Sequence, residues 1–323
     1  MKKAREKMKT KYLIPLIFII SLIFSVVLPM IATTTSISAA TKKFSDNQVN
    51  YSFNTASTSL TLTITGTGEI TDAWKTSDTL STYVTKVKKV SISKNAKLTK
   101  ISDSAFSGCT ALTTVTFGSG TIIDTIGESA FSGCTALTNL KDNSTSNKLP
   151  TSIKTIGKNA FYNCTKLAKL NLNTGVTTIG DSAFYNCKLL ATLTMGANVT
   201  TIGNSAFFNC EKLTTLTLGT KVTTVGENAF GGTTPLTTLT INSNIKNHNN
   251  AFKGHTGITT LNVGASCTNI YESMFEGCSK LKKVTLNGIT TIGTNAFKNC
   301  ATNMTISYPY TNYTSGNTDI LAR

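Results

Sequence analysis

The chain has 323 residues, of which 40% are apolar and only 14% are charged, and its formal net charge is +16. This apolar content is high enough for a folded core, which excludes a wholly disordered chain. Polarity comes mainly from Thr, Ser and Asn instead of from charge, a composition typical of β-structure with hydroxylated outward faces.

Residues 1–40 have the pattern of a secretory signal peptide. Six basic residues precede an apolar run from Tyr12 to Ala32, and Ser38 and Ala40 stand at the −3 and −1 positions of a cleavage site. The apolar run is also long enough to span a bilayer, so an uncleaved signal anchor is the alternative. Cleavage after Ala40 predicts a secreted protein, released or held at the cell surface, without a remaining membrane span.

Removal of residues 1–40 takes away six basic residues and one acidic residue, which leaves 25 basic and 14 acidic residues and a net charge of +11. Such an excess favours an anionic partner such as a glycan, a cell-wall polymer or nucleic acid. The lysines are scattered without a dense run, however, which favours an ordinary solvated surface. A secreted location argues against a nucleic-acid partner.

Residues 41–83 are predicted to form an N-terminal β cap. Two short segments alternate apolar residues with period two on either side of a Ser/Thr/Asn turn, which predicts a β-hairpin. The alternating residues are Val49, Tyr51 and Phe53 in the first segment and Leu60, Leu62 and Ile64 in the second. A hairpin of this kind would shield the first coil of a repeat array.

Residues 84–308 repeat one phrase nine times, as in "IGDSAFYNCKLLATLTM" from Ile179 to Met195. The spacings between successive central Phe residues are 25, 30, 23, 23, 23, 22, 23 and 22. A period of this length predicts a solenoid of about nine coils. The central residues are Phe106, Phe131, Phe161, Phe184, Phe207, Phe230, Phe252, Phe275 and Phe297.

The residue two places after each central Phe is always Gly or Asn, the residue types that best tolerate a positive φ. The pattern therefore predicts one short helical turn per coil, closed by a left-handed residue. Acidic or amide residues three places before Phe are expected to cap that turn. These are Asp103, Glu128, Asp181, Asn204 and Glu227.

Each turn is followed by an L-x-x-L-x-L segment, as at Leu213, Leu216 and Leu218, and then by a second short apolar pair. Alternation predicts strands with Leu pointing inward, and stacked coils would pair these strands at about 4.8 Å. No single coil could bury its apolar residues alone, so stacking must build one continuous core.

The repeat resembles the BspA-like class of leucine-rich repeat, found in secreted and surface proteins of bacteria and some protists. The resemblance covers roughly Val87 to Ile306, and the segment from Val49 to Ile70, followed by Trp74, resembles the cap that precedes such repeats. It implies a repeat solenoid, a leucine-rich-repeat-like right-handed β-solenoid with an N-terminal β-hairpin cap. Residues 309–323 depart from the repeat and are expected to be a C-terminal tail or partial cap.

A Cys stands three places after Phe in seven of the nine coils, and Thr233 and His255 take this position in the other two. No C-x-x-C pair suggests a metal site. Neighbouring coils would bring these cysteines within disulfide range, although parallel side chains give poor dihedral angles. The favoured interpretation is a ladder of buried apolar thiols, with disulfides as the alternative. Cys267 is expected to be a further core residue.

The sequence offers no catalytic constellation. His248 and His255 are the two histidines, and neither belongs to a recognisable Ser–His–acid arrangement. There is no Gly-rich phosphate loop. We therefore expect no enzyme activity, no cofactor and no metal.

The outward positions of the L-x-x-L-x-L strands form the candidate ligand-binding face. They are Thr114, Thr116, Lys141, Lys169, Thr192, Thr194, Thr215, Thr217, Thr238, Thr240, Thr260, Lys283 and Thr285, with Asn139, Asn171 and Asn262 between them. Thr also favours strands and solubility, so the face could lack a ligand. Ice binding by T-x-T ranks is a third interpretation, opposed by the Lys and Asn interruptions.

The insertion from Lys141 to Ser152 explains the 30-residue spacing and is a second place where a ligand could bind. The resemblance favours a secreted, non-enzymatic recognition or adhesion protein, expected to be a monomer, whose partner is an extracellular protein or glycan. A purely structural spacer is the alternative.

Overall fold

The computed structural model describes residues 41–55, 59–142 and 147–307, and the fold lies in the compact unit Lys42–Arg323. The predicted signal peptide, residues 1–40, and the predicted tail, residues 309–323, lie outside the described residues. Within these described ranges, no helix is long and apolar enough to cross a membrane.

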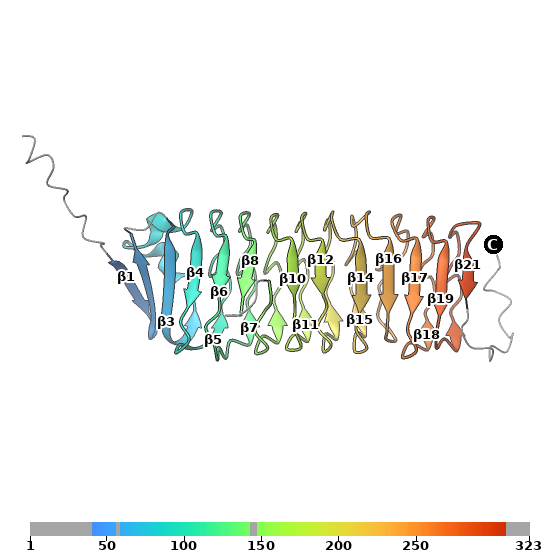
Figure 1. The fold of residues 1–323 in the computed structure, drawn as a ribbon, viewed down its shortest axis with the longest axis horizontal. Coiled ribbons are helices and arrows are strands. Elements are labelled where there is room, and N and C mark those ends of the chain that lie inside the picture. Colours follow the sequence, from blue (N-terminus) through green and yellow to red (C-terminus); the bar gives the residue numbers. More distant parts are fainter. Residues whose placement is uncertain (1–40, 56–58, 143–146, 308–323) are drawn as a thin grey trace, which may run out of the picture. The chain divides into compact units, whose positions relative to one another are not determined.

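The unit is a parallel β-solenoid whose coils contribute strands to two faces (Figure 1). The first face contains β4 (Lys89–Ile92), β6 (Thr114–Thr116), β8 (Asn139–Lys141), β10 (Lys169–Asn171), β12 (Thr192–Thr194), β14 (Thr215–Leu218), β16 (Thr238–Ile241), β17 (Thr260–Val263), β19 (Lys283–Leu286) and β21 (Thr305–Ser307). The second face contains β5 (Lys97–Ile101), β7 (Thr125–Ile126), β9 (Thr155–Ile156), β11 (Thr178–Ile179), β13 (Thr201–Ile202), β15 (Thr224–Val225), β18 (Asn269–Ile270) and β20 (Thr291–Ile292). The predicted fold class, a leucine-rich-repeat-like solenoid, is confirmed.

The N-terminal hairpin is also present. Strand β2 (Val49–Asn54) pairs antiparallel with β3 (Thr61–Ile70), and β1 (Thr41–Asp46) adds an outer strand. The predicted alternating residues of the hairpin are all buried. Strand β3 is long enough to start both faces, because its first half pairs in parallel with β4 and its second half with β5.

A short helix, α2 (Ala73–Thr76), and a 3-10 turn, η1 (Ser81–Tyr83), close the cap. The indole N–H of Trp74 donates a 2.9 Å hydrogen bond to the carbonyl of Ala105, and the Trp74 ring centroid lies 6.1 Å from that of Phe106. Trp74 is fully buried. The cap therefore supplies the first ring of the aromatic stack that runs through the core.

The central Phe residues stack on one another from coil to coil. Ring centroids are 5.1 Å apart from Phe161 to Phe184 and again from Phe184 to Phe207, with nearly parallel planes. Leu and Ile side chains from both faces fill the space around this stack in one continuous core. Each coil thus buries its apolar residues only against its neighbours, as the repeat predicts.

Each coil turns between its two faces in a segment centred on Phe, here called the turn side. The predicted left-handed residue two places after Phe is confirmed in all nine coils, for example Asn186 with φ 57°. The residue two places before Phe is left-handed as well, as at Ser182 with φ 51°, and the sequence interpretation missed it. All nine of these residues are Ser or Asn, which was the available signal.

The predicted short helical turn is present only as tight turns. Tyr185 N donates to Ser182 O at 3.1 Å and Cys187 N donates to Phe184 O at 3.2 Å, which are i to i+3 bonds. Two left-handed residues four positions apart leave no room for an i to i+4 helix. The turn-side backbone bonds to the next coil instead, since Phe184 N donates to Ala206 O at 2.7 Å.

Three of the five residues predicted to cap their own turns, Asp103, Asp181 and Asn204, cap the next coil instead. An Asp103 carboxylate oxygen accepts from Glu128 N at 2.9 Å, and an Asp181 oxygen accepts from Asn204 N at 2.7 Å. The amide oxygen of Asn204 then accepts from Glu227 N at 2.8 Å. Each side chain therefore caps the backbone of the following coil, an arrangement that stabilises stacking.

Strand pairing between successive coils is interrupted at several places, so each face divides into separate sheets. Among the described residues, the first face divides into β3-β4-β6-β8, β10-β12 and β14-β16-β17-β19-β21, and the second face divides after β15. On the first face, the break between β8 and β10 follows the insertion. On the second face, the break after β15 falls where Asn247 forms only an isolated bridge with Thr224. The break between β12 and β14 has no signal in the spacing of the repeat.

Candidate functional site: the threonine and lysine face

The candidate residues lie in two columns on the first face. Strand pairing places Thr215, Thr238, Thr260 and Lys283 in one column and Thr217, Thr240, Asn262 and Thr285 in the other. The same register aligns Thr114 with Asn139, Thr116 with Lys141, Lys169 with Thr192, and Asn171 with Thr194. The structure thus brings all thirteen predicted residues to one face, named here the Thr/Lys face.

The columns extend further than the sequence interpretation placed them. Lys89 and Ser91 of β4 pair with Thr114 and Thr116, and Thr305 of β21 pairs with Lys283. These flanking residues were missed because β4 was interpreted as the start of the solenoid and β21 as its end. They belong to the same surface.

Two kinds of Thr occur on the coils. Thr237 and Thr259, just before strands of the first face, donate their hydroxyls to Thr214 O and Thr237 O of the preceding coils, at 3.3 and 3.2 Å. Thr200, just before a second-face strand, donates to Thr177 O at 3.1 Å. These hydroxyls help to hold one coil to the next.

The outward hydroxyls differ. Among the described residues, those from β12 to β19 form no hydrogen bond within the chain, so their donors and acceptors remain available to a ligand. They belong to Thr192, Thr194, Thr215, Thr217, Thr238, Thr240, Thr260 and Thr285. Strand pairing keeps those from β14 to β19 in fixed register, which is the arrangement that preorganised recognition requires.

Strand β12 is less deeply buried than its neighbours β10 and β14. Leu193 of β12 and the nearby Met195 are only partly buried, and Leu189 is 45% exposed. This is the block that does not pair with β14. The shallower burial of β12 therefore coincides with the break in strand pairing.

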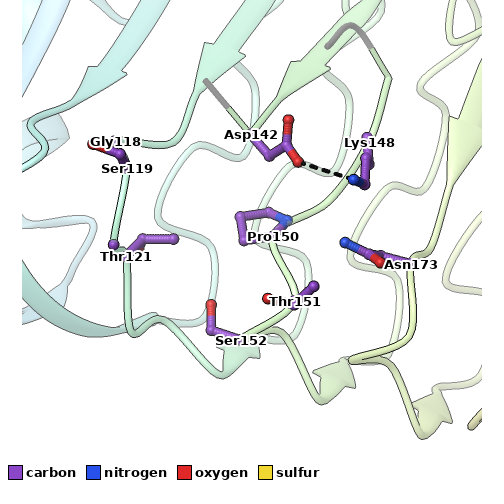
Figure 2. A pocket seen from close by; sticks show the side chains of 10 residues that line it. Gly118, Ser119, Thr121, Asp142, Lys148, Pro150, Thr151, Ser152 and Asn173 are labelled. Atoms are coloured by element: carbon purple, nitrogen blue, oxygen red, sulfur yellow. Dashed lines mark ion pairs between the residues drawn. The ribbon is translucent and has the colours of Figure 1, made fainter. Parts of the chain in front are cut away.

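The insertion borders a polar pocket of about 200 Å³ beside the N-terminal half of the face. Figure 2 shows Asp142 and Lys148 facing one another across its rim, with an ion-pair distance of 3.5 Å. Buried oxygens of Asn147 and Ser152 have no hydrogen-bond partner within the described residues. The pocket has room for a small polar group, but its main charged pair is already satisfied internally.

The cysteines form the predicted buried ladder, and all eight are free thiols. After Cys109, each ladder thiol donates to the Phe carbonyl of an earlier coil: Cys134 Sγ donates to Phe106 O at 3.2 Å and Cys187 Sγ to Phe161 O at 3.4 Å. Burial raises the pKa of the Cys109 and Cys278 thiols to about 12. High pKa values and burial make these thiols poor nucleophiles and poor metal ligands at neutral pH.

Thr233 and His255 take the place of the ladder Cys in two neighbouring coils, and their side chains hydrogen-bond to each other. Thr233 Oγ1 lies 3.0 Å from His255 Nε2, while His255 Nδ1 accepts from the backbone N–H groups of Gly257 and Ile258 at 3.2 and 3.3 Å. Nδ1 as acceptor leaves the proton of the neutral ring on Nε2. Burial lowers the pKa of His255, so the ring is a neutral core group.

His248 lies in the coil whose second-face segment forms only an isolated bridge, between Thr224 and Asn247. It is partly buried, its Nδ1 has no hydrogen-bond partner within the described chain, and burial lowers its pKa. No cluster of three or more His, Cys, Asp or Glu suited to a metal ion occurs among the described residues. The two histidines lie seven residues apart in one coil, and the chain between them contains no Asp, Glu, Ser, Thr or Cys.

Comparison with known proteins gives the family. The model of the BspA type leucine rich repeat region matches six copies, over residues 81–148, 141–254 and 246–318. No curated protein sequence matches the chain.

Several solved structures are similar. A leucine rich cell surface protein from Faecalibacterium prausnitzii is 23% identical, with a TM-score of 0.49 over 84% of this chain and 77% of that one. The T. pallidum leucine rich repeat protein is 19% identical, with a TM-score of 0.39 over 82% and 91%. The pneumococcal vaccine antigen PcpA is 15% identical, with a TM-score of 0.36 over 83% and 98%. With the family model matching more than half of its length, the chain belongs to the BspA-type leucine-rich repeat proteins.

Proposed function

We propose that this chain is a secreted or surface-held, non-enzymatic recognition protein that binds an extracellular glycan or protein through the Thr/Lys face. The observation that carries the proposal is the division of hydroxyls. Thr200 and Thr237 donate theirs to neighbouring coils, whereas the outward hydroxyls from β12 to β19 have no partner within the described chain. These outward hydroxyls are therefore available for recognition.

The secreted location rests on residues 1–40 and on the surface proteins that carry this repeat. The non-enzymatic part rests on the inert chemistry of the core thiols and on the separation of the two histidines from any acid. Adhesion is the form that such recognition takes when the partner is a host or matrix surface.

The test is an array of extracellular proteins and glycans probed with the purified protein. We expect at least one saturable ligand, whose binding is lost when Thr192, Thr194, Thr215 and Thr217 are all replaced by Ala. The matched control replaces Thr155, Thr178, Thr201 and Thr224, the outward column of the second face. Equal binding by both variants would move the site away from the Thr/Lys face.

The alternative is a structural spacer without a ligand of its own. Thr is a good strand residue, and this alone could account for the columns. A stable, folded protein that binds nothing on the array would favour the spacer.

A further inference from the structure

The Thr/Lys face contains no carboxylate. The outward positions of the ten first-face strands, from β4 to β21, hold only Thr, Ser, Asn and Lys. Figure 1 shows these strands following one another in chain order along one row. The four lysines are Lys89, Lys141, Lys169 and Lys283, and none of them makes an ion pair within the described ranges. The face is therefore positive or neutral along its whole length.

Carboxylates are placed elsewhere on the coil. Asp103 and Asp181 lie on the turn side, where each accepts a backbone N–H of the next coil. Asp142, at the end of β8, is paired with Lys148. The acidic residues are thus held away from the outward columns, and the lysines of the face are left without an internal counter-ion.

The side chains of the face also indicate the kind of partner. Protein interfaces depend on Trp, Tyr and Arg anchors, and single-stranded nucleic acid needs aromatic rings for stacking. The outward columns contain neither aromatic residues nor Arg. Hydroxyls and amides arranged in rows suit instead a partner that is itself rich in hydroxyl groups.

The spacing of the lysines indicates the size of that partner. Lys89 and Lys169 share one column and are three coils apart, and Lys169 and Lys283 are five coils apart. At about 4.8 Å per coil, these separations are roughly 14 and 24 Å. Both exceed the Debye length of about 8 Å at physiological ionic strength, so Lys89, Lys169 and Lys283 act on separate sections of a ligand. Lys141 of β8 lies one coil from Lys169 of β10 and adds to the same section.

We propose that the ligand of the Thr/Lys face is an acidic polysaccharide, an extended chain whose sugar hydroxyls meet the Thr columns and whose anionic groups meet the separated lysines. This inference rests on the proposed function. Because each lysine contributes little alone, binding requires a chain long enough to reach several of them.

The experiment measures binding of the purified protein to hyaluronan fragments of graded length, to dextran sulfate and to neutral dextran. We expect hyaluronan and dextran sulfate to bind and neutral dextran to bind at least tenfold more weakly. Hyaluronan affinity should rise steeply once the fragment exceeds roughly 14 Å, and it should fall as salt is added.

The variant K169Q/K283Q should lose about tenfold in affinity for long hyaluronan. The matched control K154Q/K246Q removes the same charge from exposed lysines of the second-face side and should lose less than about threefold. Equal losses in the two variants would show binding to net charge alone and would overturn the inference.

The inference and the proposed function fail differently. If neutral dextran binds as well as hyaluronan, or if the array finds a protein ligand on the face and no polysaccharide binds, the acidic-polysaccharide inference is overturned and the recognition function stands. If neither polysaccharides nor the array give any ligand, both are overturned.

Discussion

The turn side and the Thr/Lys face of the same coil use their polar groups in opposite ways. On the turn side, Phe184 N, Cys187 Sγ and Asn186 Nδ2 each donate to a neighbouring coil. On the face, the hydroxyls of Thr215 and Thr217 donate to nothing in the described chain. The difference shows that side-chain stacking is concentrated on one side of the coil, which leaves the other side free to vary. Four pairs of variants test this division.

The largest effect is expected from the aromatic stack. Phe184→Ala should cost about 3–5 kcal/mol in the free energy of unfolding, because it opens a cavity between two buried rings. Thr194→Ala on the face should change it by no more than about 0.5 kcal/mol. Urea unfolding followed by circular dichroism gives both values. A similar loss of unfolding free energy in the two variants would contradict the division between the buried stack and the face.

The next effect comes from the left-handed turn residue. Asn186 has φ 57°, and its side chain donates to Asn163 Oδ1 at 2.9 Å. Asn186→Ala and Asn186→Gly both remove that bond, so the difference between them reports the backbone conformation. We expect the Gly variant to be more stable by about 1 kcal/mol. An Ala variant as stable as the Gly variant would contradict a left-handed requirement.

A smaller effect is expected from pH. Burial lowers the pKa of His255, so the unfolded chain binds a proton that the folded chain does not. Stability should therefore be constant above the unfolded-state pKa of about 6.5 and should fall as the pH drops below it.

His255→Cys restores the common ladder residue and should remove most of this acid dependence. His248→Asn is the control, since His248 is less deeply buried and should account for the remainder. Melting temperatures between pH 7 and pH 5 measure both. An unchanged pH profile in the Cys variant would exclude His255 as the cause.

The smallest effect separates the two kinds of Thr. Thr200→Val removes a hydroxyl bond to Thr177 O and should cost about 0.5–1 kcal/mol. Thr217→Val removes a hydroxyl without an internal partner and should be close to neutral. The comparison is made in one urea series, where an equal cost for both would mean that the face hydroxyls also hold the coils together.

Much of this organisation could be predicted from sequence, because a solenoid repeats the same local conformation, with the same residue types, in each coil. The Phe spacing gave the coils, and Gly or Asn after Phe indicated the confirmed left-handed turn. The second left-handed position was missed because five of its nine residues are Ser, as at Ser182, and Ser is less typical of positive φ than Gly or Asn. The hydrogen bond that the Asp181 carboxylate accepts from Asn204 N was missed because Asn204 lies one full coil away in the sequence.

The candidate face shows the same limit. Alternation identified its thirteen residues, and strand register placed them together. Which hydroxyls are already bonded within the chain depends on the distance between coils, and the break between β12 and β14 depends on how Leu193 and Met195 pack. Neither property is carried by residue spacing alone.

The most direct test combines binding and stability in one variant, with Thr192, Thr194, Thr215 and Thr217 all replaced by Ala. The division between turn side and face predicts loss of binding to the ligand that the array identifies, while the free energy of unfolding stays within about 1 kcal/mol of the parent protein. A variant that keeps full binding, or one that unfolds, would contradict it.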